Sequence, residues 1–330
     1  MAFLKVFVRK AIGGLVMIFV VASFTFFLIR LMPGNPVTTK LNALLATGTP
    51  YPIALSKVSV MYGFVPNQPV WQQYLTYLGE LAHFNLGESI SYTGVSVTHI
   101  ILSAAPWTII MVLTGVIVSF VLGVLAGVIA AVWRNSWIGQ SSTFLATFLH
   151  GIPQFMLALV LAYVFTTVWR VFPFGAPYNA AIQPGWTPAF LGSLAKHAVL
   201  PVAAYAISGY GGWALTMRSS VTSVLGDEFI LAAELRGLTR GLRLRYIARN
   251  AFLPLFTTLT LSLGFMFGGS VFIESIFDYP GLGNLLTTSI GAEDYPLMQG
   301  AFLLITTAVI VANLLADLLY TAIDPRIRRA

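Results

Sequence analysis

The chain has 330 residues, of which 57% are hydrophobic and 9% are charged, and its formal net charge is +7. A soluble protein of this length could not cover so much apolar surface, so the composition predicts a polytopic membrane protein. The chain has no cysteine, which excludes disulfides, thiolate metal sites and thiol nucleophiles. Its basic residues are spread over short segments between apolar runs, a pattern that argues against nucleic-acid binding.

Six apolar segments reach the length of about 20 residues that a membrane-spanning helix needs. They are residues 9–31, 106–132, 142–169, 197–217, 254–276 and 298–322. Lys5, Arg9 and Lys10 precede the first apolar run, which is too long for a signal peptide and lacks a small-x-small cleavage site, so we expect an uncleaved span. The sequence therefore predicts an all-α polytopic membrane protein with six transmembrane helices in a single domain, residues 1–330.

The distribution of positive charge predicts the orientation of these spans. With six spans both termini lie on the same side, and the segments on that side hold thirteen of the eighteen Lys and Arg residues. The segments on the other side hold the remaining five, namely Arg30, Lys40, Lys57, Arg170 and Lys196. Because Lys and Arg are enriched in cytoplasmic segments, both termini are expected to be cytoplasmic.

The first external segment, residues 32–105, is predicted to form an extracytoplasmic cap. Its prolines break it into short pieces, and residues 71–81 have the apolar spacing of an amphipathic helix. Two short motifs, LMPGNP at 31–36 and NLGES at 85–89, lie near its ends. A role in receiving substrate or its carrier and a passive plug over the helix bundle both fit this composition.

Two predicted spans carry glycines four residues apart, Gly123 with Gly127 and Gly264 with Gly268. Such a pair leaves a groove that lets another helix backbone approach closely. Packing within the subunit and pairing between subunits both fit the pattern.

Four residues are candidates for lining a translocation pathway. His150, Pro153 and Phe155 lie in the third predicted span, where a proline inside a helix predicts a kink. The kink could line a pathway or only shape packing, and a single histidine on an apolar face is usually a packing residue. Glu274 ends the fifth span and precedes an aromatic-Pro-Gly sequence, which lipid contact alone does not explain.

Residues 218–253 form the one long polar interruption in the C-terminal half and hold six of the eighteen basic residues. Apolar residues between Phe229 and Leu235 predict a short helix, and Gly237 is placed to end it. A second basic helix is expected from about Leu242 to Phe252, before Pro254 opens the next apolar run. Such a helix–Gly–helix element between two spans is expected at the membrane surface.

The motif AAELRG at 232–237, followed by RNAFLP at 249–254, resembles the cytoplasmic loop of permease subunits of ATP-binding-cassette importers that move peptides, nickel and some oligosaccharides. The family usually has a small residue where Leu235 stands, and its spacing from the glycine to the Arg-Asn-Ala segment differs by one residue. Further similar motifs occur in order at 150–155, 274–283, 294–296 and 317–326, so the resemblance covers nearly the full length.

This resemblance implies an inner-membrane permease subunit of a bacterial or archaeal cell that forms a pathway with a second, homologous permease chain. Two cytoplasmic ATPase subunits would bind ATP and Mg²⁺, and an extracytoplasmic binding protein would deliver substrate. The chain itself has no G-x-x-x-x-G-K-[ST] phosphate loop and no clustered metal ligands, so no cofactor or metal is expected on it. Short peptides are the expected substrate, with nickel and oligosaccharides as the nearest alternatives.

The resemblance also implies that the short helix couples this chain to an ATPase. The coupling residues are Phe229, Ala232, Ala233, Glu234, Leu235, Arg236, Gly237 and Leu238. We expect Phe229, Leu235 and Leu238 to anchor the helix in a groove, and Glu234 and Arg236 to pair with charges of the partner.

Two other interpretations remain open from the residues alone. The polar loop could simply lie in the lipid interface, with its arginines held by anionic headgroups. Alternatively, the chain could be a membrane-embedded enzyme that uses Glu274, Asp317 or His150, because ionisable residues inside a membrane are usually functional.

Overall fold

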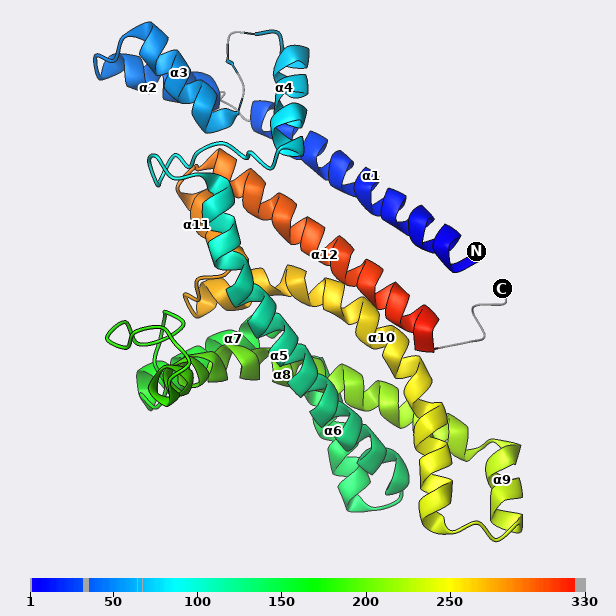
Figure 1. Cartoon of the computed structure of the whole chain (residues 1–330). Helices are drawn as coiled ribbons and strands as arrows, with labels where there is room; N and C mark the ends of the chain where they lie inside the picture. Colours follow the sequence, from blue (N-terminus) through cyan, green and yellow to red (C-terminus); the bar gives the residue numbers. More distant parts are fainter. Residues whose placement is uncertain (1, 32–35, 64, 67, 324–330) are drawn as a thin grey trace.

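The computed structural model describes residues 2–31, 36–63, 65–66 and 68–323, and this part of the chain is built from helices (Figure 1). Their bounds are α1 Ala2–Leu31, α2 Pro36–Ala46, α3 Tyr51–Tyr62, α4 Val70–Ala82, α5 Val97–Val132, α6 Trp137–His150, α7 Gln154–Ala162, the π-helix η1 Tyr163–Val168, α8 Pro188–Leu225, α9 Glu228–Leu235, α10 Arg240–Ile276, α11 Leu282–Gly291 and α12 Tyr295–Ile323. The predicted all-α class is confirmed.

Four helical stretches of the described part are long and apolar enough to cross a membrane. They are Phe7–Leu28, Val97–Val132, Pro188–Leu225 and Tyr295–Leu315. The broken pair formed by α6 with α7 and η1 is a fifth candidate. The remaining predicted span, residues 254–276, lies in α10, where most side chains fall outside the described part, so a sixth crossing stays a prediction.

The third predicted span is not one kinked helix. α6 ends at His150, Pro153 precedes the first residue of α7, and the two helices are bent by 94°. A proline has no N–H to donate and disfavours helical backbone at the residue before it, so the chain leaves the helix ahead of Pro153. The structure therefore replaces the expected kink with a corner.

Two other spans are longer than predicted. α5 begins at Val97, ahead of Pro106, and α8 begins at Pro188, ahead of Pro201. Both prolines lie inside their helices, and each helix continues past the one backbone hydrogen bond that its proline cannot make.

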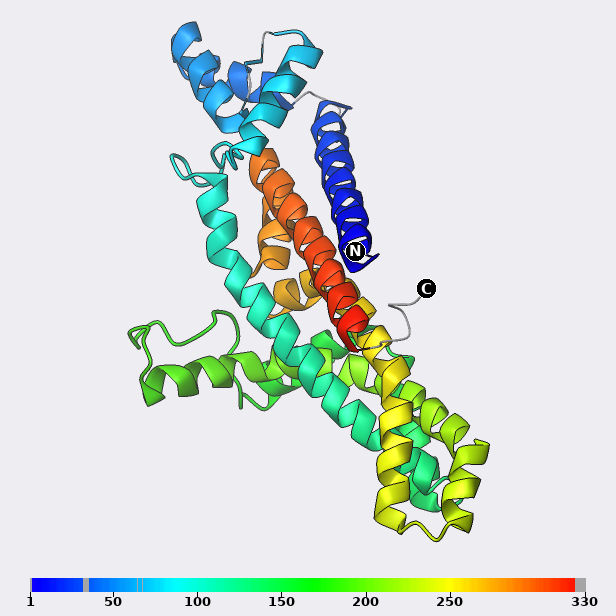
Figure 2. The ribbon, with the colours of Figure 1, turned by 45° about the vertical axis from the view of Figure 1, so that its right-hand side comes forward.

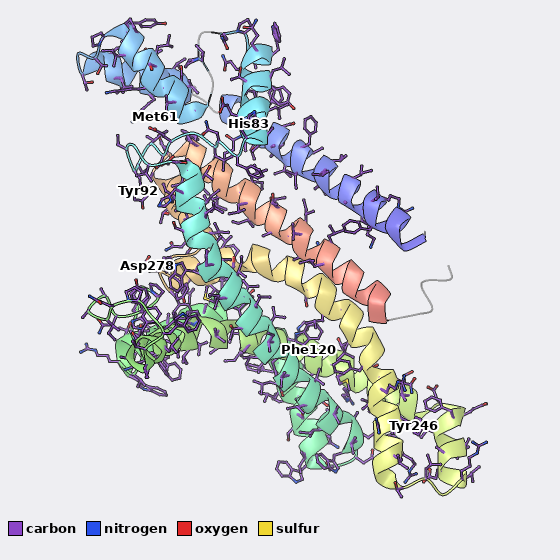
Figure 3. All side chains as sticks on the ribbon, viewed as in Figure 1. Met61, His83, Tyr92, Phe120, Tyr246 and Asp278 are labelled. Carbon is purple, nitrogen blue, oxygen red and sulfur yellow. The ribbon has the colours of Figure 1, made fainter. Side chains whose placement is uncertain are left out.

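α5 and α8 cross closely because glycines of α5 face α8. A Cβ added at Gly123 would overlap the Cβ of Trp213, and one added at Gly127 would lie 2.5 Å from the carbonyl oxygen of Ala214. The Gly123–Gly127 pair thus serves packing within the subunit, which was one of its two interpretations. Phe120 of α5 makes edge-to-face contacts with the rings of Trp213 and Phe252, and so joins α5 to α8 and α10 (Figure 3).

Residues 36–82 form a small helical unit at one end of the molecule. α4, Val70–Ala82, confirms the amphipathic helix expected at 71–81, and the ring of Tyr77 in α4 stacks on Phe26 of α1 at 5.1 Å. Met61 and Tyr62 of α3 belong to the same buried cluster. Figure 2 shows this unit at the opposite end of the bundle from α9.

Candidate functional site

The polar loop between α8 and α10 folds into the short helix α9. Glu228 lies in its first turn, where a negative charge is favourable beside the helix dipole. Gly237 follows the helix with a φ of 71°, and its N–H donates to the carbonyl of Glu234 at 2.9 Å. The N–H of Leu238 donates to the carbonyl of Ala233 at 3.1 Å. This left-handed glycine end confirms the predicted stop of the helix.

Ile230 attaches α9 to the rest of the bundle. It is only 7% exposed and belongs to a buried cluster formed with α5, α8 and α10. The other buried members are Ala131, Met217, Val221, Val224, Ile247, Ala251 and Leu255. The hydroxyl of Ser220 in α8 donates to the carbonyl of Ala251 in α10 at 2.7 Å, which fixes the two helices beneath α9.

The outer face of α9 is apolar and uncovered in this chain. Successive residues of a helix are rotated by about 100°, so Leu231 and Leu235 lie on the side away from Ile230. Leu231 is 59% exposed and Leu235 is 81% exposed, and Phe229, about 160° around the helix from Leu231, is 42% exposed. Leu231 was not among the predicted anchors, although its four-residue spacing from Leu235 is a signal that could have found it.

The remaining predicted coupling residues lie around this face. Ala232 and Arg236 are exposed, whereas Ala233 and Leu238 are half-buried. The carboxylate of Glu234 forms an ion pair at 2.5 Å with Arg243 in the first turn of α10, so in this chain it has an internal partner.

The basic segment after Gly237 is not a separate helix. α10 runs without interruption from Arg240 through Pro254 to Ile276, and Figure 1 shows it bent between its two ends. A proline inside a helix removes one hydrogen bond and bends the helix, but it need not end a helix that is packed on both sides of it. Ala251 and Leu255, on either side of Pro254, are fully buried.

Three of the four pathway candidates lie at the corner between α6 and α7. A Cβ added at Gly211 of α8 would lie 2.7 Å from the Cβ of His150, so this corner is packed closely on α8. Pro153 and Phe155 are exposed on the same corner, and the ring of Phe155 lies 6.3 Å from that of Phe272 in α10. The structure brings these residues together, and whether they contact substrate stays a prediction.

Glu274, the fourth candidate, is fully buried in α10. Its Oε2 accepts hydrogen bonds from the N–H groups of Gly283 at 2.6 Å and Asn284 at 3.3 Å. Glu274 thus caps the first turn of α11, and a pathway role for it stays a prediction. The side chain of Asp317 lies outside the described part of the chain.

Asp294 connects two of the sequence motifs, those at 85–89 and 294–296, through hydrogen bonds. It is fully buried, and its Oδ2 accepts hydrogen bonds from the hydroxyl of Ser89 at 2.5 Å and from the N–H of Ser91 at 2.9 Å. Its Oδ1 accepts from the N–H of Leu297 at 3.2 Å, which caps α12. The sequence analysis identified both motifs but did not predict that they contact each other. Residues 32–35 of the motif at 31–36, and residues 324–326 of the C-terminal motif, lie outside the described part.

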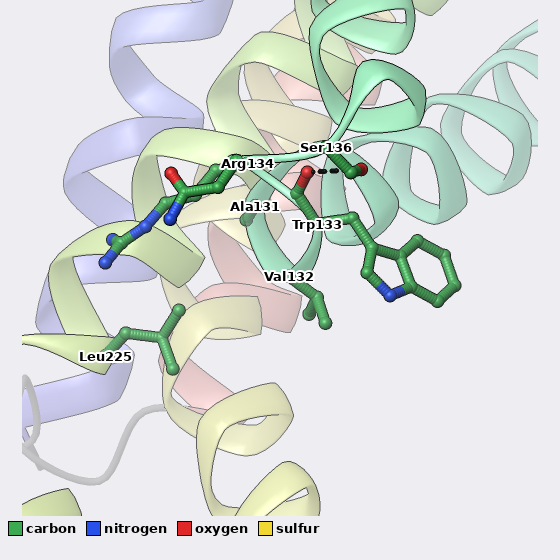
Figure 4. A pocket seen from close by; sticks show the side chains of 7 residues that line it. Ala131, Val132, Trp133, Arg134, Ser136 and Leu225 are labelled. Carbon is green, nitrogen blue, oxygen red and sulfur yellow. Dashed lines mark hydrogen bonds between the residues drawn. The ribbon is translucent and has the colours of Figure 1, made fainter.

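An open pocket of about 480 Å³ lies beside the buried cluster that contains Ile230, called here the α9 cluster (Figure 4). The turn between α5 and α6 lines it, together with Leu225 of α8. The turn is fixed because the hydroxyl of Ser136 donates to the carbonyl of Trp133 at 2.8 Å, and Arg134 lies between these two residues. Ala131 belongs both to this pocket and to the α9 cluster, so the pocket and α9 lie at the same end of the bundle.

Comparison with known proteins identifies the family. The family described as "Binding-protein-dependent transport system inner membrane component" matches residues 123–329. A protein of Brucella suis biovar 1 (strain 1330), named as a peptide permease, is 32% identical over 98% of this chain and 99% of its own length. The oligopeptide transport system permease protein of Haemophilus influenzae is 33% identical over the same shares, 98% and 99%. The glutathione transport system permease protein of Escherichia coli O6:H1 is 29% identical over 97% and 98%. The chain belongs to the family of inner membrane components of binding-protein-dependent transport systems.

Proposed function

We propose that this chain forms one half of the translocation pathway of an ATP-binding-cassette importer for short peptides. Three similar proteins are named for transport of peptides, oligopeptides and glutathione, and all three align over nearly their whole length. These names favour peptides over nickel and oligosaccharides, the alternatives that the sequence left open. The family is one of transport components, so the chain is a transporter subunit and not a membrane-embedded enzyme.

The exposed apolar face of α9 carries the proposal that the chain is driven by a partner ATPase. Ile230 holds the helix on the bundle, while Leu231, Leu235 and Phe229 point outward from it. An apolar helix face that enters a groove of another protein is a recurring mode of recognition, and a few large side chains supply most of its binding energy. ATP and Mg²⁺ would be held by two ATPase subunits, because this chain has no phosphate loop.

The arrangement of the first and last helices supports the proposed topology. Gly14 of α1 faces Ile310 of α12, and Thr25 of α1 accepts a hydrogen bond from Gln299 of α12 at 3.3 Å. The two helices therefore run antiparallel, so that α1 begins at the end where α12 finishes. We propose six crossings with both termini and α9 in the cytoplasm. The unit of residues 36–82 would then face the binding protein, and the second permease chain would complete the pathway.

The test is a comparison of leucine variants in one membrane preparation that also holds the ATPase subunits. Leu231→Ala and Leu235→Ala should each weaken ATPase co-purification and transport, because removing a central apolar anchor typically costs about 1–2 kcal/mol or more. Leu242→Ala is the matched control, since Leu242 is an exposed leucine of α10 that lies outside α9. Parental assembly and transport in both α9 variants would mean that this face only contacts lipid.

Substrate class needs a separate measurement. Vesicles that contain the complete transporter and its binding protein should accumulate labelled di- or tripeptides in the presence of ATP. Uptake of nickel or of an oligosaccharide in place of peptides would leave the coupling proposal intact and replace the substrate.

A further inference from the structure

We infer that Glu274 is a positioning residue that makes α11 move together with α10. A displacement of α9 would then be carried along α10 to α11, toward the other end of the helix bundle. The inference rests on the proposed function, in which α9 receives force from an ATPase. It concerns how that force travels, and it assigns a role to a buried acidic residue that the docking proposal does not use.

α10 directly connects the two regions. It begins at Arg240, where Arg243 pairs with Glu234 of α9, and it ends at Ile276, two residues beyond Glu274. Its 37 residues correspond to about 55 Å of continuous helix at 1.5 Å per residue. α10 is helical throughout between these ends, although Pro254 removes one backbone hydrogen bond and the helix is bent. In this proposal, movement at its first turn is carried along the helix to its last turn.

Glu274 then fastens the end of α10 to the start of α11. The first N–H groups of a helix have no partner within it, and a carboxylate is a favourable acceptor there because of the helix dipole. Glu274 accepts from two of these groups, those of Gly283 at 2.6 Å and Asn284 at 3.3 Å. Two glycines make the approach possible: a Cβ added at Gly281 would overlap the carboxyl of Glu274, and one at Gly283 would overlap Val271 of α10.

Further contacts join α11 to α5 and, a second time, to α10. The N–H of Leu282 donates to the hydroxyl of Thr108 in α5 at 2.7 Å, and Thr108 is fully buried. One turn along α11, the hydroxyls of Ser275 and Thr287 lie 2.7 Å apart and join α10 to α11 a second time. Two independent links between the same two helices would oppose a hinge between them.

The first test locks the junction with a disulfide. The chain contains no cysteine, so Ser275→Cys with Thr287→Cys creates a single possible internal bridge, and hydroxyls 2.7 Å apart place the two positions within disulfide range. The double variant is reconstituted with its ATPases and binding protein, then oxidised, and peptide uptake and ATP hydrolysis are measured before and after reduction. If α10 and α11 move as one body, the oxidised transporter works like the reduced one.

Two outcomes would overturn the inference. Transport that stops on oxidation and returns on reduction would show that α11 must move against α10. Failure of the pair to cross-link would show that the helices are not joined at this point in the membrane. The control is Ser275→Cys with Thr288→Cys, because the hydroxyl of Thr288 donates to carbonyls of its own helix, those of Asn284 and Leu285, and should give no bridge. A parent complex that does not transport would instead contradict the proposed function.

The second test compares Glu274→Gln with Glu274→Ala. The amide oxygen of Gln can accept the same N–H bonds, so we expect Glu274→Gln to keep transport within about twofold of the parent, whereas Glu274→Ala leaves buried N–H groups without an acceptor. In assembled complexes, Glu274→Ala should lower peptide transported per ATP hydrolysed by about tenfold, the effect of losing about 1.4 kcal/mol of coupling. A proportional fall of transport and hydrolysis, or equal loss in both variants, would assign Glu274 a merely structural role.

Discussion

Ile230 and Leu231 are adjacent in the chain but point in directions about 100° apart around α9. Ile230 is 7% exposed and Leu231 is 59% exposed, so one holds the helix on the bundle and the other is available to a partner. Isoleucine and leucine have side chains of the same size and similar hydrophobicity, so only the contacts of α9 with the bundle distinguish the two positions.

This division predicts different effects of two alanine substitutions. Ile230→Ala should destabilise the attachment of α9 by about 2–4 kcal/mol, because it leaves a cavity among buried side chains. Leu231→Ala should leave that attachment unchanged in the isolated chain, since its side chain is exposed. The measurement is hydrogen exchange of the α9 amides in lipid nanodiscs. Equal exchange in both variants would contradict the assignment of Ile230 as the attachment.

Gly237 allows a test of backbone conformation alone. Its φ is 71°, and a Cβ added there would meet nothing within 4 Å. A larger residue would therefore be strained by the left-handed backbone conformation and not by a clash with neighbouring atoms. We predict that Gly237→Val costs about 1 kcal/mol or more and redirects α9, whereas Gly237→Asn is tolerated because Asn accepts left-handed backbone. Transport and ATPase co-purification are the readouts.

Gly241 is the matched control for this experiment. It lies in α10, four residues along the chain, and a Cβ added there also meets nothing within 4 Å, but its φ is not positive. Gly241→Val should therefore transport like the parent, since valine forms helix slightly more readily than glycine. If Gly237→Val and Gly241→Val behave alike, the left-handed turn after α9 has no special role.

At the scale of the elements, α4 has one aromatic residue exposed to solvent and another packed against α1. Trp71 is 62% exposed, whereas the hydroxyl of Tyr74 lies 2.6 Å from that of Ser23 and its ring lies against Phe26 and Phe27 of α1. Both aromatic residues belong to the amphipathic pattern at 71–81. Only Trp71 is free to meet a protein that approaches from outside.

We therefore predict that Trp71→Ala weakens docking of the binding protein, by about 1 kcal/mol or more if Trp71 is an interface anchor, without changing protein stability. Tyr74→Ala should instead loosen α4 from α1 and lower thermal stability. Binding-protein affinity and thermal unfolding are measured on both variants in lipid nanodiscs. Unchanged docking in Trp71→Ala would favour a unit that only covers the bundle.

At the scale of the whole molecule, the proposed topology places Ser56 and Thr239 on opposite sides of the membrane. Both residues are exposed, and the chain has no cysteine to interfere with labelling. Ser56→Cys should react with an impermeant thiol reagent in intact cells, and Thr239→Cys only after lysis, because the proposed topology puts thirteen of eighteen basic residues on the side of Thr239. Labelling of Thr239→Cys in intact cells would invert the topology.

The corner between α6 and α7 depends on how distant helices pack in the whole molecule. A proline in the third apolar run indicates a disturbed helix, but only the structure gives the bend of 94° and shows α6 packed closely on α8 at Gly211. The same holds for α10, which passes through Pro254 because buried residues hold it on both sides. Proline alone specifies a missing hydrogen bond, and its surroundings decide whether the helix bends, breaks or continues.

Sequence alone determined the all-α membrane class, the amphipathic helix at 71–81 and the short helix that ends before Gly237. These follow from composition, apolar spacing and the backbone preferences of single residues, all of which act over a few neighbouring positions. Only the tertiary structure decided that Ile230 faces inward, that Ser89 meets Asp294, and that Glu274 caps α11. Each of these depends on which helices lie side by side, and pairing between distant segments is set by the packing of the whole chain, which local patterns do not encode.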